Sequence, residues 1–157
     1  MRRDPKEGRM NVTEIRVKLL PRQRDKLRGF ASITVDDMLV IRDIKIIEGG
    51  NGLFVAMPSR KLCDRCPSCA GKNHVRARYC NECGGALDAG RGGLDERGRP
   101  RLYADISHPI NQRARDFVQT RVLEAFRAEI EQSKQEGYKA VVFDDLDYDY
   151  LAEYTAG

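Results

Sequence analysis

The sequence lacks long apolar runs and an apolar leader. No window in its 157 residues approaches the roughly 18–20 consecutive apolar residues that are needed to cross a bilayer. Residues 1–10 are rich in charge and lack the apolar core of a secretory signal. These two absences predict a cytoplasmic protein in a reducing compartment, with no membrane partner.

Aromatic residues and histidine are also scarce. Aromatic side chains make up 7% of the chain, and the only histidines are His74 and His108. His108 has no nucleophile or carboxylate at the spacing of a catalytic motif, and a lone histidine more often makes a structural hydrogen bond. We therefore expect no enzyme activity, no catalytic residue and no small-molecule substrate.

Charge is plentiful and unevenly distributed. Residues 1–62 carry 14 Lys and Arg against 8 Asp and Glu, whereas residues 138–157 carry one against five. The basic body favours a polyanionic partner, although the same charges also serve solubility. The acidic tail lacks the glycine turn and terminal glutamate of a calcium loop. One hypothesis is that this tail folds back on the basic residues and competes with nucleic acid.

Four of the five cysteines form two Cys-x-x-Cys pairs separated by ten residues. They are Cys66, Cys69, Cys80 and Cys83. Two such pairs supply four thiolates, which is the closed tetrahedral ligand set of a structural zinc site. A reducing compartment also favours metal binding over disulfides. The sequence therefore predicts one structural zinc ion.

Other ligand sets are possible. Cys63 can pair with Cys66 and leave Cys69 free, although the residues between Cys63 and Cys66 lack turn-forming proline and glycine. His74 can replace a cysteine, but a lone histidine in such a loop is more often exposed. A redox dithiol is disfavoured because such motifs usually open a helix after a strand. A catalytic zinc is disfavoured because four thiolates leave no open position.

The segments on either side of the cysteines read as one α+β domain. Alternating apolar residues predict strands at 12–20, 30–35, 39–48 and 102–106. The continuous apolar run 53–57 predicts a central strand, and turns are expected at Asp36-Asp37 and at 49–52. Asn111 is a suitable N-cap for an amphipathic helix over 112–133. The region 140–143 is a candidate for one more short strand.

Five segments of the chain resemble a known family. They are NVTEIRV (11–17), FASITVD (30–36), VIRDIKIIEG (40–49), NGLFVAMPSRK (51–61) and YADISHPIN (103–111). Together they closely resemble the stage V sporulation protein G (SpoVG) family over about 11–62 and 101–130. Separately, the segment 66–87 resembles the short zinc ribbons found in many proteins.

The resemblance implies a small antiparallel β-sheet with a C-terminal helix, usually a homodimer. It also implies a regulatory role through DNA or RNA binding, in processes such as sporulation and septation, and no catalysis. The family usually joins the Pro-Ser-Lys/Arg turn directly to the next strand, where this chain carries the cysteines. We therefore expect a discontinuous SpoVG-like domain (11–62 plus 101–135), a zinc-ribbon insertion (63–88), a flexible linker (89–100) and an acidic tail (138–157).

Basic residues are the candidates for nucleic-acid contact. The resemblance implies Arg60 and Lys61 beside the Pro-Ser turn, and Arg113 and Arg115 on the helix. The ribbon adds Arg65, Lys72, Arg76 and Arg78. Such residues contact phosphates, so we expect backbone-dominated binding with weak sequence preference. The alternative function is a protein-interaction adaptor that uses the ribbon and the acidic tail without nucleic acid.

Overall fold

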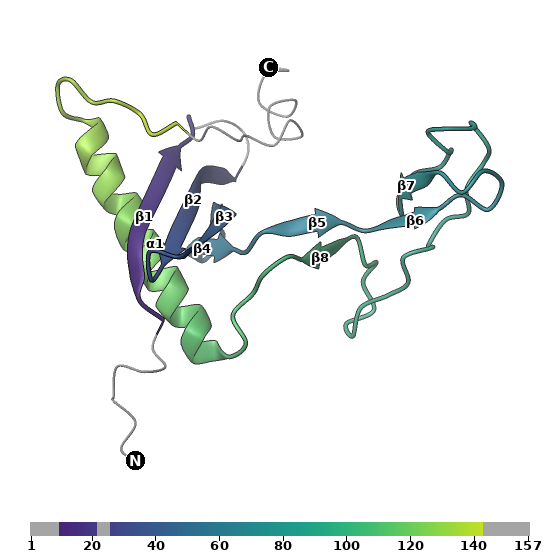
Figure 1. Cartoon of the computed structure of the whole chain (residues 1–157), viewed down its shortest axis with the longest axis horizontal. Helices are drawn as coiled ribbons and strands as arrows, with labels where there is room; N and C mark the ends of the chain where they lie inside the picture. The colour runs from purple at the N-terminus through teal and green to yellow at the C-terminus, as the bar shows by residue number, and fades with distance from the viewer. Residues whose placement is uncertain (1–9, 22–25, 143–157) are drawn as a thin grey trace, which may run out of the picture. The chain divides into compact units, whose positions relative to one another are not determined.

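The computed structural model describes residues 10–21 and 26–142. The chain divides into two compact units (Figure 1). We call Met1–Ala56 with Pro109–Gly157 the sheet–helix unit, and Met57–His108 the inserted unit. Antiparallel strands and one C-terminal helix confirm the expected α+β class. Most of the predicted acidic tail, residues 143–157, lies outside the described residues.

An antiparallel sheet of four strands, in the order β1-β2-β3-β4, forms the larger layer of the sheet–helix unit. Its strands are β1 (Val12–Leu19), β2 (Leu27–Val35), β3 (Leu39–Gly49) and β4 (Gly52–Ala56). Asp36 and Asp37 connect β2 to β3 with φ of 51° and 54°. Two successive positive φ angles are those of a tight hairpin turn whose twist matches the flanking strands, and Asp tolerates this conformation.

The expectation of a central strand at 53–57 is wrong. β4 pairs only with β3 and is an outer strand of the four-stranded sheet. Val55 is buried, whereas Phe54 on the opposite side is 42% exposed. A short run of apolar residues does not by itself distinguish a buried central strand from an outer strand. Ala140–Val142, in the region considered for a short strand, is likewise not in a strand.

The helix α1 (Gln112–Ser133) covers one face of this sheet, as Figure 1 shows. Asn111 is its N-cap, and the Asn111 Oδ1 atom accepts a 2.8 Å hydrogen bond from the amide of Ala114. The buried stripe of the helix consists of Val118, Val122, Leu123 and Phe126. The sheet contributes Val17, Ala31, Ile33, Ile44 and Ile46 to the core. The predicted helix and its cap are therefore confirmed.

Two small antiparallel strand pairs build the inserted unit. β5 (Ser59–Lys61) pairs with β8 (Tyr103–Asp105), and β6 (Cys63–Arg65) pairs with β7 (Lys72–His74). Leu62 joins the two pairs, because its amide donates to Leu102 and its carbonyl accepts from Val75, at 2.9 and 3.0 Å. The predicted strand at 102–106 thus pairs with β5 and does not extend the four-stranded sheet.

Residues 89–100, for which the sequence predicts a linker, follow a defined path. The Asp95 amide donates to the Arg99 carbonyl at 2.8 Å, and the Arg101 amide donates to the Gly93 carbonyl at 3.0 Å. The Asp95 Oδ1 atom accepts from the amides of Arg97 and Arg99. Hydrogen bonds from the Arg99 amide and then the Arg97 amide lower the pKa of Asp95.

Across the part of the chain that the structure describes, no helix is long and apolar enough to cross a membrane.

Candidate metal centre

The two Cys-x-x-Cys segments have the same backbone geometry. In the first, the Cys66 amide donates to the Gly71 carbonyl at 2.8 Å and the Ala70 amide to the Cys66 carbonyl at 2.9 Å. In the second, the Cys80 amide donates to the Gly85 carbonyl at 2.8 Å, and the Gly84 amide donates to the Cys80 carbonyl at 2.9 Å. Ala70 and Gly84 occupy the same position in each turn, with φ of 63° and 73°. The sequence therefore forms two equivalent knuckles that present their sulfur atoms to a common centre.

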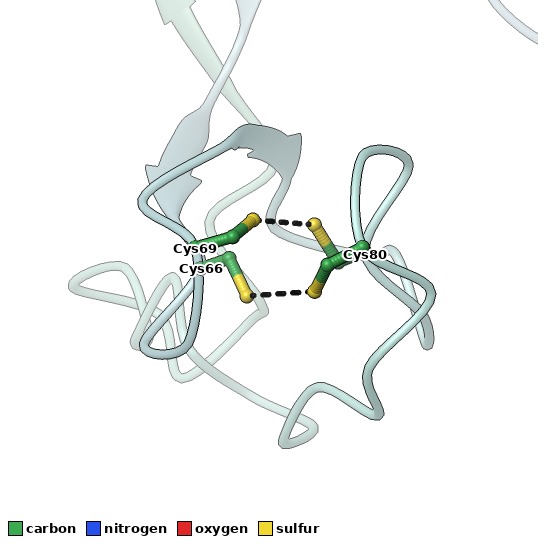
Figure 2. Close-up of side chains that lie close together, drawn as sticks. Cys66, Cys69 and Cys80 are labelled. Carbon is green, nitrogen blue, oxygen red and sulfur yellow. Dashed lines mark hydrogen bonds between the residues drawn. The ribbon is translucent and has the colours of Figure 1, made fainter.

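The four predicted sulfur ligands lie together (Figure 2). The Sγ atoms of Cys66, Cys69, Cys80 and Cys83 all lie within 4.8 Å of one another. Cys66 Sγ is 3.8 Å from Cys83 Sγ, and Cys69 Sγ is 3.5 Å from Cys80 Sγ. A tetrahedron with Zn–S bonds of about 2.3 Å has S···S edges of about 3.8 Å. The spacing and the all-thiolate donor set therefore fit a tetrahedral zinc ion.

Each sulfur also accepts a backbone hydrogen bond. The donors are the amides of Ser68, Gly71, Glu82 and Gly85, each 3.4 Å from its sulfur. The buried Asn73 side chain adds a bond to Cys80 Sγ at 3.3 Å, and its Oδ1 atom accepts from the Asn81 amide at 2.8 Å. Donors around a ligating group fix its orientation and stabilise its negative charge. Asn73 therefore ties the second knuckle to β7.

The thiols have divergent proton affinities. The Cys83 amide and then the Asn73 side chain lower the pKa of Cys80 to about 6. The amides of Cys69 and Ser68 lower the pKa of Cys66. The Gly71 amide acts to lower the pKa of Cys69, but the Cys80 thiol and burial raise that pKa to about 12. Crowded sulfurs resist full ionisation unless a cation offsets their charge, so zinc affinity falls as the pH falls and protons compete for the sulfurs.

The two alternative ligands lie outside this group of four sulfurs. Cys63 is exposed on β6, and its Sγ atom lies 3.5 Å from the Lys61 carbonyl. The His74 Nδ1 atom accepts a 3.0 Å hydrogen bond from the Arg76 amide. Burial and then the positive charges of Lys61, Arg76 and Arg91 lower the pKa of His74. In this arrangement, four cysteines form the centre without Cys63 or His74.

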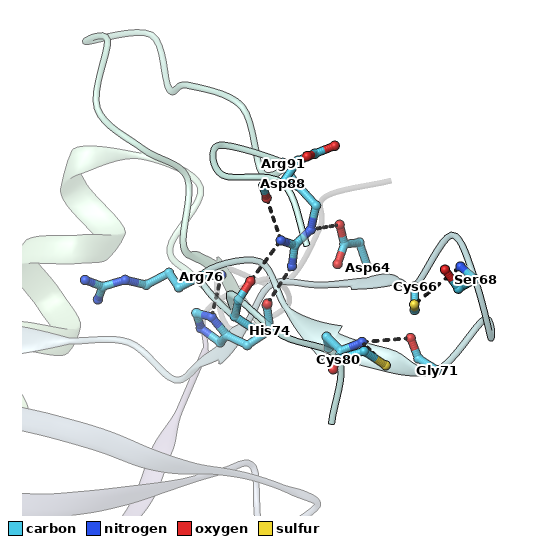
Figure 3. A network of polar contacts seen from close by, with 11 residues as sticks. Asp64, Cys66, Ser68, Gly71, His74, Arg76, Cys80, Asp88 and Arg91 are labelled. Atoms are coloured by element: carbon cyan, nitrogen blue, oxygen red, sulfur yellow. Dashed lines mark hydrogen bonds and ion pairs between the residues drawn. The ribbon is translucent and has the colours of Figure 1, made fainter. Parts of the chain in front are cut away.

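Arg91 connects the loop after the second knuckle to β6 and β7 (Figure 3). Its Nε atom donates to Asp64 Oδ2 at 2.6 Å, and its Nη2 atom donates to the His74 carbonyl at 3.0 Å. Its Nη1 atom donates to the carbonyls of Ala77 and Asp88 at 3.0 and 2.6 Å. The Arg91 side chain is only 13% exposed. One planar guanidinium thus links four parts of the inserted unit.

Replacing Arg91 with alanine is expected to loosen the inserted unit. The change leaves Asp64 without its cation and three carbonyls without their donor, which costs about 2–4 kcal/mol of local stability. Amide hydrogen exchange of β6 and β7 in the zinc-loaded protein measures this loss. Arg97→Ala, at an exposed position of the same loop, is the matched control. Equal exchange in the two variants would show that Arg91 has no such role.

Six of the eight predicted nucleic-acid residues lie in the inserted unit, and all six are exposed. They are Arg60 and Lys61 on β5, Arg65 on β6, Lys72 on β7, and Arg76 and Arg78 in the loop after β7. Arg76 and Arg78 also line a groove of about 290 Å³ together with Arg101. Arg113 and Arg115 are exposed on α1 in the sheet–helix unit.

Sequence reasoning missed two residues of this centre. The Asn73 side chain bonds the Cys80 Sγ atom, seven positions away in the chain, and the Arg91 side chain bonds Asp64, 27 positions away. Neither belongs to a Cys-x-x-Cys pair, and an arginine among glycines reads as a solvated loop residue. Only the folded arrangement of β6 and β7 brings their partners together, so no local signal identified them.

Comparison with known proteins gives the family. The SpoVG family model matches residues 10–128. "Putative septation protein SpoVG" of Lachnospira eligens is 38% identical over 117 residues, which is 74% of this chain and 91% of that protein. Proteins of the same name from Clostridium beijerinckii and Bdellovibrio bacteriovorus are 32% and 33% identical. These matches cover 82% and 77% of this chain, and 100% and 77% of the two relatives. The chain belongs to the SpoVG family.

Proposed function

We propose that this protein is a nucleic-acid-binding regulator in which a structural zinc ion organises the inserted unit. The observation that carries the proposal is the gathering of six exposed cationic residues on one small unit that holds a four-sulfur centre. Clusters of Lys and Arg on one surface are the usual footprint of phosphate recognition. Membership of the SpoVG family, whose regulatory members are expected to bind DNA or RNA, supports the same function.

Zinc has a structural role in this proposal. The Cys66, Cys69, Cys80 and Cys83 thiolates would hold the ion, and as a Lewis acid it would neutralise their charge and cross-link the two knuckles. Four thiolates leave no position for water or substrate. The inserted unit consists of three-residue strands and loops, and Val75 is among the few buried apolar side chains near the knuckles. So small a core needs a metal cross-link to stay folded.

The test is the salt dependence of oligonucleotide binding. With about six phosphate contacts, the affinity should fall roughly 300- to 2,000-fold between 50 and 200 mM salt. Fluorescence anisotropy with labelled DNA and RNA of random sequence measures this slope on the full-length, zinc-loaded protein. Absence of binding at 50 mM salt would refute the proposal and favour the alternative, a protein-interaction adaptor.

Formation of a homodimer stays a prediction from the family resemblance. The outer strand β4, with Phe54 42% exposed, is a strand edge at which a second chain can pair. Light scattering at micromolar concentration gives the molar mass directly. A mass of one chain over the whole concentration range would contradict the prediction.

A further inference from the structure

One face of the two strand pairs carries alternating cations and rings. β5, Leu62 and β6 form one extended run, because Leu62 is hydrogen-bonded to both partner segments. Side chains two positions apart in an extended run lie on the same face. Lys61, Cys63 and Arg65 therefore share a face, and their register partners are Tyr103, His74 and Lys72. We call these six residues the strand-pair face.

The strand-pair face is open to solvent, whereas the intervening residues of β6 and β7 point inward. Five of its six side chains are exposed, and His74 is half-buried. Between them, Asn73 is buried and bonded to Cys80, and Asp64 is bonded to Arg91. One side of this strand pair thus holds the metal centre and the Arg91 network together, and the other side is available to a partner.

The two rings on this face have the features of stacking platforms. Tyr103 is 55% exposed, and its hydroxyl has no hydrogen-bond partner among the described residues. The His74 ring is held by the Arg76 amide at its Nδ1 atom, and the His74 carbonyl is held by Arg91 (Figure 3). Burial and then the positive charges of Lys61, Arg76 and Arg91 lower the pKa of His74, which favours the neutral ring. The His74 ring is therefore held in place before any ligand binds, and the exposed Tyr103 ring offers a free face to a ligand.

The cations sit directly beside the rings. Lys61 lies opposite Tyr103 in the β5–β8 register, and Lys72 lies opposite Arg65 in the β6–β7 register. The Arg65 Nη1 atom bonds the Ala70 carbonyl of the first knuckle at 3.1 Å, so its position depends on the folded knuckle. Flat rings between cations match a chain of unpaired bases on a phosphate backbone. In a duplex the bases stack on one another and offer no free face to such rings.

We propose that the strand-pair face binds single-stranded nucleic acid, with unpaired bases stacked on Tyr103 and His74 and phosphates held by Lys61, Arg65 and Lys72. This inference rests on the proposed function and names its ligand class. Stacking accepts every base, so the binding has little sequence preference. A two-stranded β-ribbon can also enter the major groove of duplex DNA. Duplex binding is therefore the competing outcome of the test.

The experiment compares single-stranded and duplex oligonucleotides of one length on the full-length, zinc-loaded protein. Tyr103→Ala and His74→Ala should each weaken single-strand binding by about 5- to 150-fold, as expected for the loss of one stacked base. Tyr103→Phe should bind like the wild type, because it keeps the ring. Tyr79→Ala is the control, since Tyr79 is 68% exposed in the same unit but lies outside the strand-pair face. Zinc content verifies that each variant retains the folded knuckles.

The outcomes separate this inference from the function on which it rests. Stronger binding of single strands than of duplex, lost with Tyr103→Ala and kept with Tyr103→Phe, supports it. The inference is overturned if duplex binds more tightly than single strands, or if single-strand binding depends on salt but neither Tyr103→Ala nor His74→Ala weakens it. Either result leaves the proposed function standing. If the wild-type protein binds neither form at 50 mM salt, both are refuted.

Discussion

Replacing Cys80 with serine is expected to release the zinc ion and unfold the inserted unit while the sheet–helix unit stays folded. Cys80 is 4% exposed and receives bonds from Asn73 and the Glu82 amide, so its loss removes the most enclosed ligand. Zinc binding contributes on the order of 10 kcal/mol to the folding of small zinc domains. The sheet–helix unit has its own core around Val122 and Ile44, which are fully buried.

Metal analysis and amide hydrogen exchange together measure this result. Protection of β6 and β7 should vanish in the Cys80→Ser variant, while protection of β2, β3 and α1 should persist. Cys63→Ser is the matched control, because Cys63 lies outside the group of four sulfurs and should leave one zinc per chain. If Cys63→Ser lost the ion and Cys80→Ser kept it, the assignment of the ligands would be wrong.

Removing four cations from the inserted unit is expected to abolish most of the nucleic-acid affinity. The variant replaces Lys61, Arg65, Lys72 and Arg76 with glutamine, and all four side chains are exposed. Each lost phosphate contact lowers the salt slope by about 0.7–0.9, so four lower the affinity roughly a thousandfold at 100 mM salt. Salt titrations of oligonucleotide binding measure both quantities.

The control for this variant carries the same change in net charge elsewhere. It replaces Lys26, Arg127, Lys134 and Lys139, which are exposed and lie in the sheet–helix unit, with glutamine. A general dependence on net charge would weaken both variants alike. If the interface lies in the inserted unit, the first variant loses oligonucleotide affinity, whereas the salt slope of the second variant stays almost unchanged. Equal losses in the two variants would contradict the assignment of the interface to the inserted unit.

Local signals in the sequence were sufficient for the helix and for the four cysteines whose sulfur atoms lie together. Asn111 and the spacing of apolar residues mark α1, because a cap and a periodic stripe depend on residues within a few positions of one another. The Cys66–Cys69 and Cys80–Cys83 pairs carry the same kind of local information, since each knuckle closes on itself.

Pairing between distant segments could not be predicted in this way. β8 pairs with β5 across more than forty residues, and the apolar run of β4 gave no sign that it is an outer strand. Arg91 and Asp64 are 27 positions apart in the chain and meet only in the folded inserted unit. The strand-pair face depends on the same long-range register, because Tyr103 meets Lys61 only through the β5–β8 pair.

The zinc-dependent nucleic-acid binding proposed for this protein is tested by measuring the oligonucleotide affinity of one preparation before chelation, after chelation and after zinc is restored. We expect one zinc ion per chain, a loss of affinity of at least about tenfold on removal of the ion, and recovery with one equivalent of zinc. The proposed role of zinc would be contradicted if the purified protein contained no zinc. It would also be contradicted if the protein kept its oligonucleotide affinity and the protection of its β6 and β7 amides after complete chelation.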